Sequence, residues 1–370
     1  MRRYDIDTLR VIVFGLLIFY HVSDFFGPGF FFIKNQTTYD WLAYPMLFLH
    51  QWRLPLLFMI SGMGTFFNIS KRNGLGFLKE RLVRLLIPLV VGILIVIPPQ
   101  VYLERLDTGL FTGNYFEFWP SKAFIGAYPD GNLSWHHLWF LPYLLLFSCI
   151  LTPVFMYLRN HPQSWIIRTT KYLANYKFGI FLLTFPLLVW DLFINPRFPA
   201  NFQLVGDWFQ IVNYGTLFFY GFLFMTLKEV LWENMAKNRR LYLLTAIIAF
   251  PLLMFIDYGL GEFHRKTIIV AILKVVNMWA WILAFITYAA TYLNKKSRKL
   301  SYANQAVYPF YILHQTVIVI LGYYLKDLDL GFAVKFSMMI IGTFGISWLI
   351  YEFGIRRFTW IRPLFGMKMK

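Results

Sequence analysis

Ten apolar stretches alternate with short polar connections along the 370-residue chain. Each stretch is roughly 17 to 28 residues long, and an α-helix needs about 20 apolar residues to cross the hydrocarbon core of a bilayer. The pattern predicts an all-α fold, a polytopic transmembrane helix bundle that forms a single domain over residues 1–370. The predicted spans are 8–27, 41–68, 83–104, 136–157, 178–194, 209–231, 241–257, 267–293, 305–325 and 333–357.

Basic residues are distributed unequally between the two sets of loops that ten spans create. The loops on the side of the N-terminus hold 24 Lys and Arg residues, and the loops on the opposite side hold eight. Cytosolic loops of membrane proteins carry this excess of positive charge. The distribution therefore predicts ten spans in the plasma (inner) membrane, with both termini in the cytosol.

The composition supports a membrane protein and excludes other classes. Hydrophobic residues make up 58% of the chain and charged residues only 14%, below the quarter or so found in soluble domains. The net charge of +17 would suit a nucleic-acid partner, but no soluble domain is present to carry a basic surface. We therefore expect the lipid bilayer as a partner and no nucleic acid. No spacing of His, Cys, Asp or Glu resembles a metal site, so we expect no metal and no tightly bound cofactor.

The first span carries an arginine near its beginning and a histidine near its end. His21 follows Arg10 by eleven positions, about three helical turns, so both side chains leave the same face about 16 Å apart. Ionisable groups inside a membrane are costly, and such a pair indicates a functional site. The alternative is that Arg10 reaches the cytosolic headgroups and His21 the opposite interface.

Asp24 lies three residues after His21 and could orient its imidazole, an arrangement suited to a general base. Asp24 could equally be a solvated loop residue. On the second span, His50 and Arg53 also share a face, where they could line a site or form a structural cluster.

Arg81 and Arg84 repeat the three-residue spacing at the cytosolic boundary of the third span. Two guanidinium groups on one face suit a phosphate, which arginine binds bidentately. Ordinary anchoring to the cytosolic headgroups is the alternative. Of the remaining histidines, His137 and His314 fall on apolar segments and are further candidates.

Together these residues resemble the type-3 membrane acyltransferases, and in particular their periplasmic-glucan succinyltransferase branch. The similar stretches occur in order along the chain: Asp7-Thr-Leu-Arg10 with His21, His50-Gln-Trp-Arg53 through Ser61-Gly62, Arg81-Leu-Val-Arg84 with Pro88, His137-Leu-Trp139-Phe140, Tyr311-Ile-Leu-His314 and Tyr351-Glu352. The resemblance implies an enzyme that transfers an acyl group from cytosolic acyl-CoA to a hydroxyl of a carbohydrate acceptor outside the cytosol.

The resemblance also implies roles for individual residues. His21 would be the catalytic base, and Arg10 would contact the acyl donor. Arg81 and Arg84 would contact the donor phosphates, and Arg53, His137 and His314 would be site-lining candidates. The residues themselves add Asp24 as the partner of His21, and His50 and Trp139 as further substrate-binding candidates. Arg53 or Trp139 could stabilise the developing oxyanion.

Two other classes of protein remain open. In a proton- or solute-coupled transporter, the same buried histidines and arginines would line a path. Such a protein predicts inverted repeats between the two halves of the chain, which the sequence does not display. A structural membrane subunit would fit the helices but would leave the histidines and arginines unexplained.

Overall fold

The computed structural model describes residues 3–256 and 267–369, and the regular elements in these ranges are all helical. The all-α prediction is therefore confirmed for the described part of the chain. Four of the Lys and Arg residues counted in the loops, Arg2, Arg265, Lys266 and Lys370, lie outside the described ranges, as does the last residue of the predicted span 241–257.

The chain forms two compact units, each assembled from three separate stretches of sequence. The first comprises Met1–Arg10, His50–Glu80 and Tyr143–Ser297, and the second comprises Val11–Leu49, Arg81–Pro142 and Arg298–Lys370. Helices α1 (Tyr4–Phe26) and α2 (Ala43–Ile69) each continue from one unit into the other. That residues 1–370 act as one domain remains a prediction.

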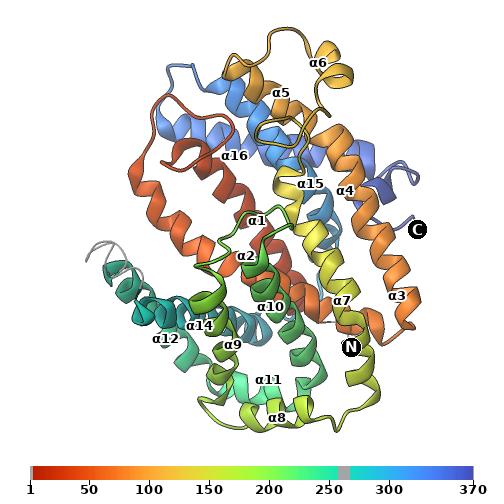
Figure 1. The fold of residues 1–370 in the computed structure, drawn as a ribbon, viewed down its shortest axis with the longest axis vertical. Helices are drawn as coiled ribbons and strands as arrows, with labels where there is room; N and C mark the ends of the chain where they lie inside the picture. The colour runs from red at the N-terminus through yellow and green to blue at the C-terminus, as the bar shows by residue number, and fades with distance from the viewer. Residues whose placement is uncertain (1–2, 257–266, 370) are drawn as a thin grey trace. The chain divides into compact units, whose positions relative to one another are not determined.

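Each of the ten predicted spans falls on helical structure (Figure 1). Among the described residues, six helical segments are long and apolar enough to cross a membrane: Tyr4–Phe26, Gly74–Asp107, His136–Asn160, Ile268–Tyr292, Arg298–Leu325 and Phe332–Ile355. The protein is thus a multi-pass membrane protein, and the total of ten spans with cytosolic termini remains a prediction.

In the first unit, α2 and α10 approach each other closely at two glycines. A Cβ atom on Gly62 would lie 1.9 Å from the carbonyl oxygen of Phe218, and a Cβ on Gly221 would lie 1.9 Å from that of Met59. Small residues permit such close helix packing in membranes. The other helices of this unit are α7 (Phe140–Asn160, continuing from the second unit), α8 (Trp165–Ala174), η5 (Gly179–Leu183), α9 (Thr184–Val189), η6 (Trp190–Ile194), α10 (Trp208–Thr226), α11 (Lys228–Lys237), α12 (Arg239–Met254) and α14 (Ile268–Tyr292).

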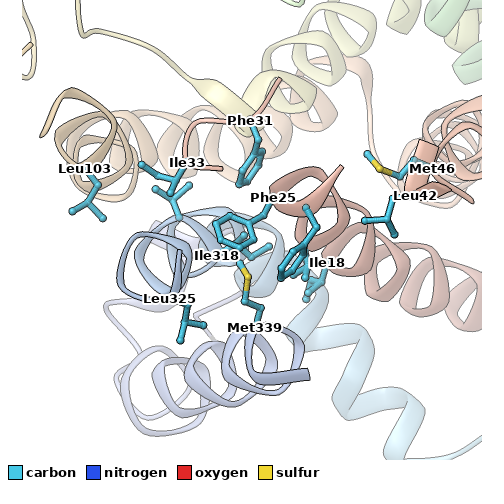
Figure 2. Packing of buried hydrophobic residues seen from close by; sticks show 13 residues of the cluster. Ile18, Phe25, Phe31, Ile33, Leu42, Met46, Leu103, Ile318, Leu325 and Met339 are labelled. Carbon is cyan, nitrogen blue, oxygen red and sulfur yellow. The ribbon is translucent and has the colours of Figure 1, made fainter. Parts of the chain in front are cut away.

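In the second unit, α15 packs against α16 and α5, and the end of α1 joins the same apolar core. Figure 2 shows Phe25 of α1 among Phe31, Ile318 and Met339. This core fixes the turn of α1 that carries His21. The elements of this unit are η1 (Asp40–Leu42), α3 (Gly74–Arg81, continuing from the first unit), η2 (Leu82–Leu86), α4 (Ile87–Val91), η3 (Gly92–Val96), α5 (Pro98–Asp107), α6 (Tyr115–Ser121), η4 (His136–Trp139), α15 (Arg298–Leu325), α16 (Phe332–Leu349), η8 (Ile350–Ile355) and η9 (Arg362–Phe365).

A π-helical turn precedes two consecutive prolines, Pro98 and Pro99. The π-helical turn η3 ends two residues before Pro98, which has no N–H to donate to the carbonyl of Leu94. The indole Nε1 of Trp119 donates to that carbonyl instead, at 2.9 Å. The long loop of 105–135 is therefore attached to the helix through a carbonyl that the proline leaves available.

Candidate active site

His21 is held by a carboxylate from its own helix. Its Nδ1 lies 3.0 Å from Oδ2 of Asp24, and the side chains are 18% and 13% exposed. A carboxylate accepts hydrogen bonds, so Nδ1 carries a proton, and in the neutral imidazole the lone pair is on Nε2. The predicted contact between Asp24 and His21 is present, and it selects the tautomer that a general base requires.

Lys34 secures the end of α1 directly after this pair. Its ammonium donates to the carbonyl oxygens of Asp24 at 2.7 Å, Gly29 at 2.8 Å and also Gly27. A cation is favourable at the negative end of the helix dipole. Burial lowers the pKa of Lys34, and the charge of Asp24 acts in the opposite direction. Lys34 thus fixes the backbone from which Asp24 reaches His21.

Two further histidines lie beside His21. The ring centroid of His314, on α15, is 5.4 Å from that of His21, and the ring of His137, on η4, is 5.0 Å from that of His314. His314 has no exposed surface and His137 is 6% exposed. The fold therefore gathers three predicted site histidines from distant parts of the sequence, which we name the histidine cluster (His21, His137 and His314).

Backbone carbonyls of α15 orient the two buried rings of the histidine cluster. Nδ1 of His314 donates to the carbonyl of Tyr311 at 2.7 Å, and Nε2 of His137 donates to that of Ile312 at 3.0 Å. A carbonyl only accepts, so the other ring nitrogen of each histidine carries a lone pair. Those nitrogens, Nε2 of His314 and Nδ1 of His137, have no hydrogen-bond partner among the described residues. Buried polar atoms left this way require an explanation, and a catalytic role is one such explanation.

Two tyrosines of α15 connect the histidine cluster with the predicted arginine pair. Tyr308, Tyr311 and His314 follow at three-residue intervals, so they share one helix face over about 9 Å. The hydroxyl of Tyr308 donates to the carbonyl of Arg84 at 2.8 Å, and the rings of Tyr308 and Tyr311 stack 6.3 Å apart. The hydroxyl of Tyr311 donates to the carbonyl of His137 at 2.6 Å.

The arginine pair lies at the other end of this column. Arg81 and Arg84 are both half-buried, and Nε of Arg84 donates to the carbonyl of Gly366 at 3.4 Å. Gly366 has φ of +69°, a conformation that glycine adopts without strain. The structure therefore brings the predicted arginines and histidines to opposite ends of one series of α15 side chains.

An aromatic series extends from His21 towards the loop of 105–135. The ring of Phe31 stacks 6.3 Å from His21, Phe32 follows at 5.6 Å, and His136 lies 4.3 Å from Phe32. Tyr128 of the loop meets His136 at 4.8 Å. Sequence reasoning assigned no role to His136, and its part in this series depends on the folding of the loop.

The other predicted site residues are placed as follows. Arg10, His50 and Arg53 belong to the first unit, where Nη1 of Arg10 lies 3.8 Å from Oδ1 of Asp7. Arg53 is 2% exposed, whereas His50 is exposed. Trp139 is half-buried at the end of η4, in the second unit. A role in the site remains a prediction for these four residues.

The sequence did not identify Tyr308 as a site residue, and it did not predict the structural role of Tyr311. Their three-residue spacing ahead of His314 is visible in the sequence, but apolar packing explains such spacing equally well. The carbonyl contacts that distinguish the two tyrosines come from other helices and have no sequence signature.

Comparison with known proteins supports an assignment. Residues 3–352 match a protein family described as an acyltransferase domain. The chain is also similar to the glucans biosynthesis protein C of Escherichia coli K12, with 23% identity over 366 residues that cover 96% of this chain and 92% of that protein. The protein of the same name from Salmonella agona is likewise 23% identical over 365 residues, with the same coverage. No solved structure shows a significant match.

Proposed function

Because the chain belongs to this acyltransferase family and is a membrane acyltransferase, we propose that it transfers an acyl group from acyl-CoA to a hydroxyl of a carbohydrate, with His21 as the general base. The observation that carries the proposal is the hydrogen bond from Nδ1 of His21 to Asp24, which leaves Nε2 to accept a proton beside His314. The donor binds from the cytosol, and the acceptor lies on the opposite side of the plasma (inner) membrane. The excess of basic residues in alternate loops supports this sidedness and ten spans with cytosolic termini.

The reaction follows from the protonation state of His21. Nε2 accepts the proton of the acceptor hydroxyl while that oxygen attacks the thioester carbonyl. The tetrahedral intermediate then collapses, the carbon–sulfur bond breaks, and the imidazolium returns the proton to the departing thiolate. Asp24 stabilises the imidazolium between these two steps.

His314 and His137 provide two further ring nitrogens that can accept hydrogen bonds near the reacting atoms. Nε2 of His314 has a lone pair and lies beside His21, so it can accept a hydrogen bond from the acceptor hydroxyl or from protonated His21. The ring of His137 packs against the ring of His314, and the backbone carbonyl of His137 accepts a hydrogen bond from the hydroxyl of Tyr311. We propose that Arg53 or Trp139 stabilises the oxyanion. Arg10 and His50 are proposed to contact the substrates.

The name of the similar proteins supports a glucan as the acceptor. The aromatic series from Phe31 to Tyr128 would lie along the route by which such an acceptor reaches His21. Aromatic rings with a polar edge suit a substrate that has both apolar faces and hydroxyl groups.

The first test concerns the proposed binding of the donor phosphates by Arg81 and Arg84. Replacing both arginines, Arg81→Gln/Arg84→Gln, is expected to raise KM for acyl-CoA about 10- to 100-fold, because a hydrogen bond to a charged group contributes about 1.5–3 kcal/mol. The value of kcat is expected to change less than KM. Steady-state kinetics of the purified protein measure both. The control is Lys79→Gln, an exposed cation on the same α3 helix. An effect on protein abundance alone would favour headgroup anchoring.

Asp24 gives the second test. Asp24→Asn is expected to lower kcat about 10- to 100-fold while KM for acyl-CoA stays constant, because the variant loses a charge-assisted hydrogen bond to the imidazolium. The matched control is Asp40→Asn, an exposed carboxylate of the same unit. Equal activity of Asp24→Asn and wild type would remove Asp24 from the mechanism.

A further inference from the structure

A cavity of about 180 Å³ lies between α1, α15 and α16 in the second unit. Its wall includes Phe14 and Gly15 of α1, Ala303 and Ala306 of α15, and Phe344 of α16, and His314 lines it as well. Gly15 leaves open space beside this wall, because a Cβ atom added there would have no neighbour within 4 Å. The cavity therefore reaches the histidine cluster through His314 and has room beside Gly15.

The polar groups that border the cavity are engaged in hydrogen bonds, except Nε2 of His314 at the histidine cluster. The hydroxyl of Tyr302 donates to Glu352 at 2.7 Å and accepts from the indole of Trp348 at 2.9 Å. The hydroxyl of Tyr311 and Nδ1 of His314 donate to backbone carbonyls. The remaining lining side chains are apolar. A ligand in this space would consequently have to be apolar along its length.

The apolar lining of the cavity favours some parts of an acyl-CoA donor over others. The pantetheine arm carries two amides, and each unpaired amide would cost about 1–3 kcal/mol on burial. A carboxylate at the end of an acyl group would cost more, since the cavity lining contains no cation. A hydrocarbon chain needs no partner and gains from burial.

We propose that this cavity receives the acyl chain of the donor, so that the enzyme prefers an unsubstituted hydrocarbon acyl group of medium length to a short or carboxylate-terminated one. The inference rests on the proposed function, because it requires the thioester to lie at the histidine cluster. His314 belongs to both the cavity and the cluster, which places the reacting carbonyl at the mouth of the cavity. An apolar cavity of about 150 Å³ holds benzene, so about 180 Å³ accommodates roughly six to eight carbon atoms.

The test measures the affinity of the purified protein in nanodiscs for acetyl-, butyryl-, succinyl-, hexanoyl-, octanoyl- and dodecanoyl-CoA. Binding is expected to strengthen with each added methylene, by up to about fourfold, until the cavity is full near eight carbons. Succinyl-CoA is expected to bind more weakly than its uncharged four-carbon analogue, butyryl-CoA. Transfer of labelled acyl groups to a soluble glucan is measured in parallel.

The variant Gly15→Leu tests whether reducing the volume of the cavity weakens the binding of long acyl chains. The added side chain enters the cavity, so the ratio of octanoyl-CoA to acetyl-CoA affinity is expected to fall at least tenfold. Ala303→Leu is expected to act in the same direction and keeps the test decisive if the first variant folds poorly. The matched control is Gly345→Leu on α16, where an added Cβ also meets no neighbour within 4 Å but the residue does not line the cavity.

The outcomes separate the two proposals. Affinities that are independent of chain length, or a ratio that Gly15→Leu leaves unchanged, would overturn the acyl-chain pocket while the proposed function stands, and a lipid tail would then be the occupant of the cavity. Failure to bind any acyl-CoA would overturn both. A chain-length optimum that Gly15→Leu shifts to shorter acyl groups, with Gly345→Leu resembling wild type, would establish the pocket.

Discussion

His21→Ala is expected to lower the rate of acyl transfer about 10²- to 10⁴-fold, the usual contribution of a general base. The variant removes the lone pair of Nε2 that the hydrogen bond to Asp24 exposes. Affinity for acyl-CoA is expected to remain within about twofold, because we propose that the phosphates bind at the arginine pair, at the opposite end of the α15 tyrosines from His21. Rates are measured with labelled acyl-CoA and a soluble glucan, and donor binding is measured separately.

The control for this prediction is His161→Ala, an exposed histidine of the first unit whose Nδ1 contacts the carbonyl of Tyr157. It is expected to retain the wild-type rate. Near wild-type turnover by His21→Ala would exclude His21 as the base, and loss of donor binding in that variant would show that His21 has a different role.

Gly221→Ala is expected to destabilise the protein severely, by about 3 kcal/mol or more, because overpacking alone costs about 1–3 kcal/mol. Here the added Cβ would lie 1.9 Å from a backbone carbonyl oxygen of α2, which no side-chain rotation relieves. Thermal unfolding in detergent measures the effect, and most of the variant is expected to be recovered aggregated or degraded.

Gly215→Ala on the same helix is the matched control. Its added Cβ would meet the ring of Phe147 at 3.4 Å, an ordinary contact, so stability is expected to change little. Equal stability of the two variants would show that α2 and α10 do not pack as closely as described.

The helices were predictable because their signal is local. An apolar run of about 20 residues has few alternatives to a helix, since buried backbone groups must find partners within the segment. The contact between His21 and Asp24 was predictable for the same reason, because three-residue spacing brings two side chains together on any helix. Both the helices and this contact can be predicted from residues that are close together in the sequence.

The histidine cluster is different, because His21, His137 and His314 are more than 100 residues apart in sequence. No spacing rule connects them, and only the resemblance to known acyltransferases suggested that they share a site. Their tautomers depend on two carbonyls of α15, which carry no sequence signal.

The cavity beside Gly15 could also not be predicted from the sequence. A glycine in an apolar helix can mark close packing, as Gly221 does, or open space, as Gly15 does. The two cases differ only in what the neighbouring helices place opposite the glycine. The roles of Arg10, His50 and Arg53 remain predictions, and these three residues belong to the first unit.

The most direct measurement of the central claim uses vesicles that contain the reconstituted protein, with labelled acyl-CoA sealed inside and a soluble glucan outside. We predict that the wild type labels the external glucan, and that His21→Ala, with donor binding intact, does so about 10²- to 10⁴-fold more slowly. Labelling of the external glucan by His21→Ala at the wild-type rate would contradict the claim.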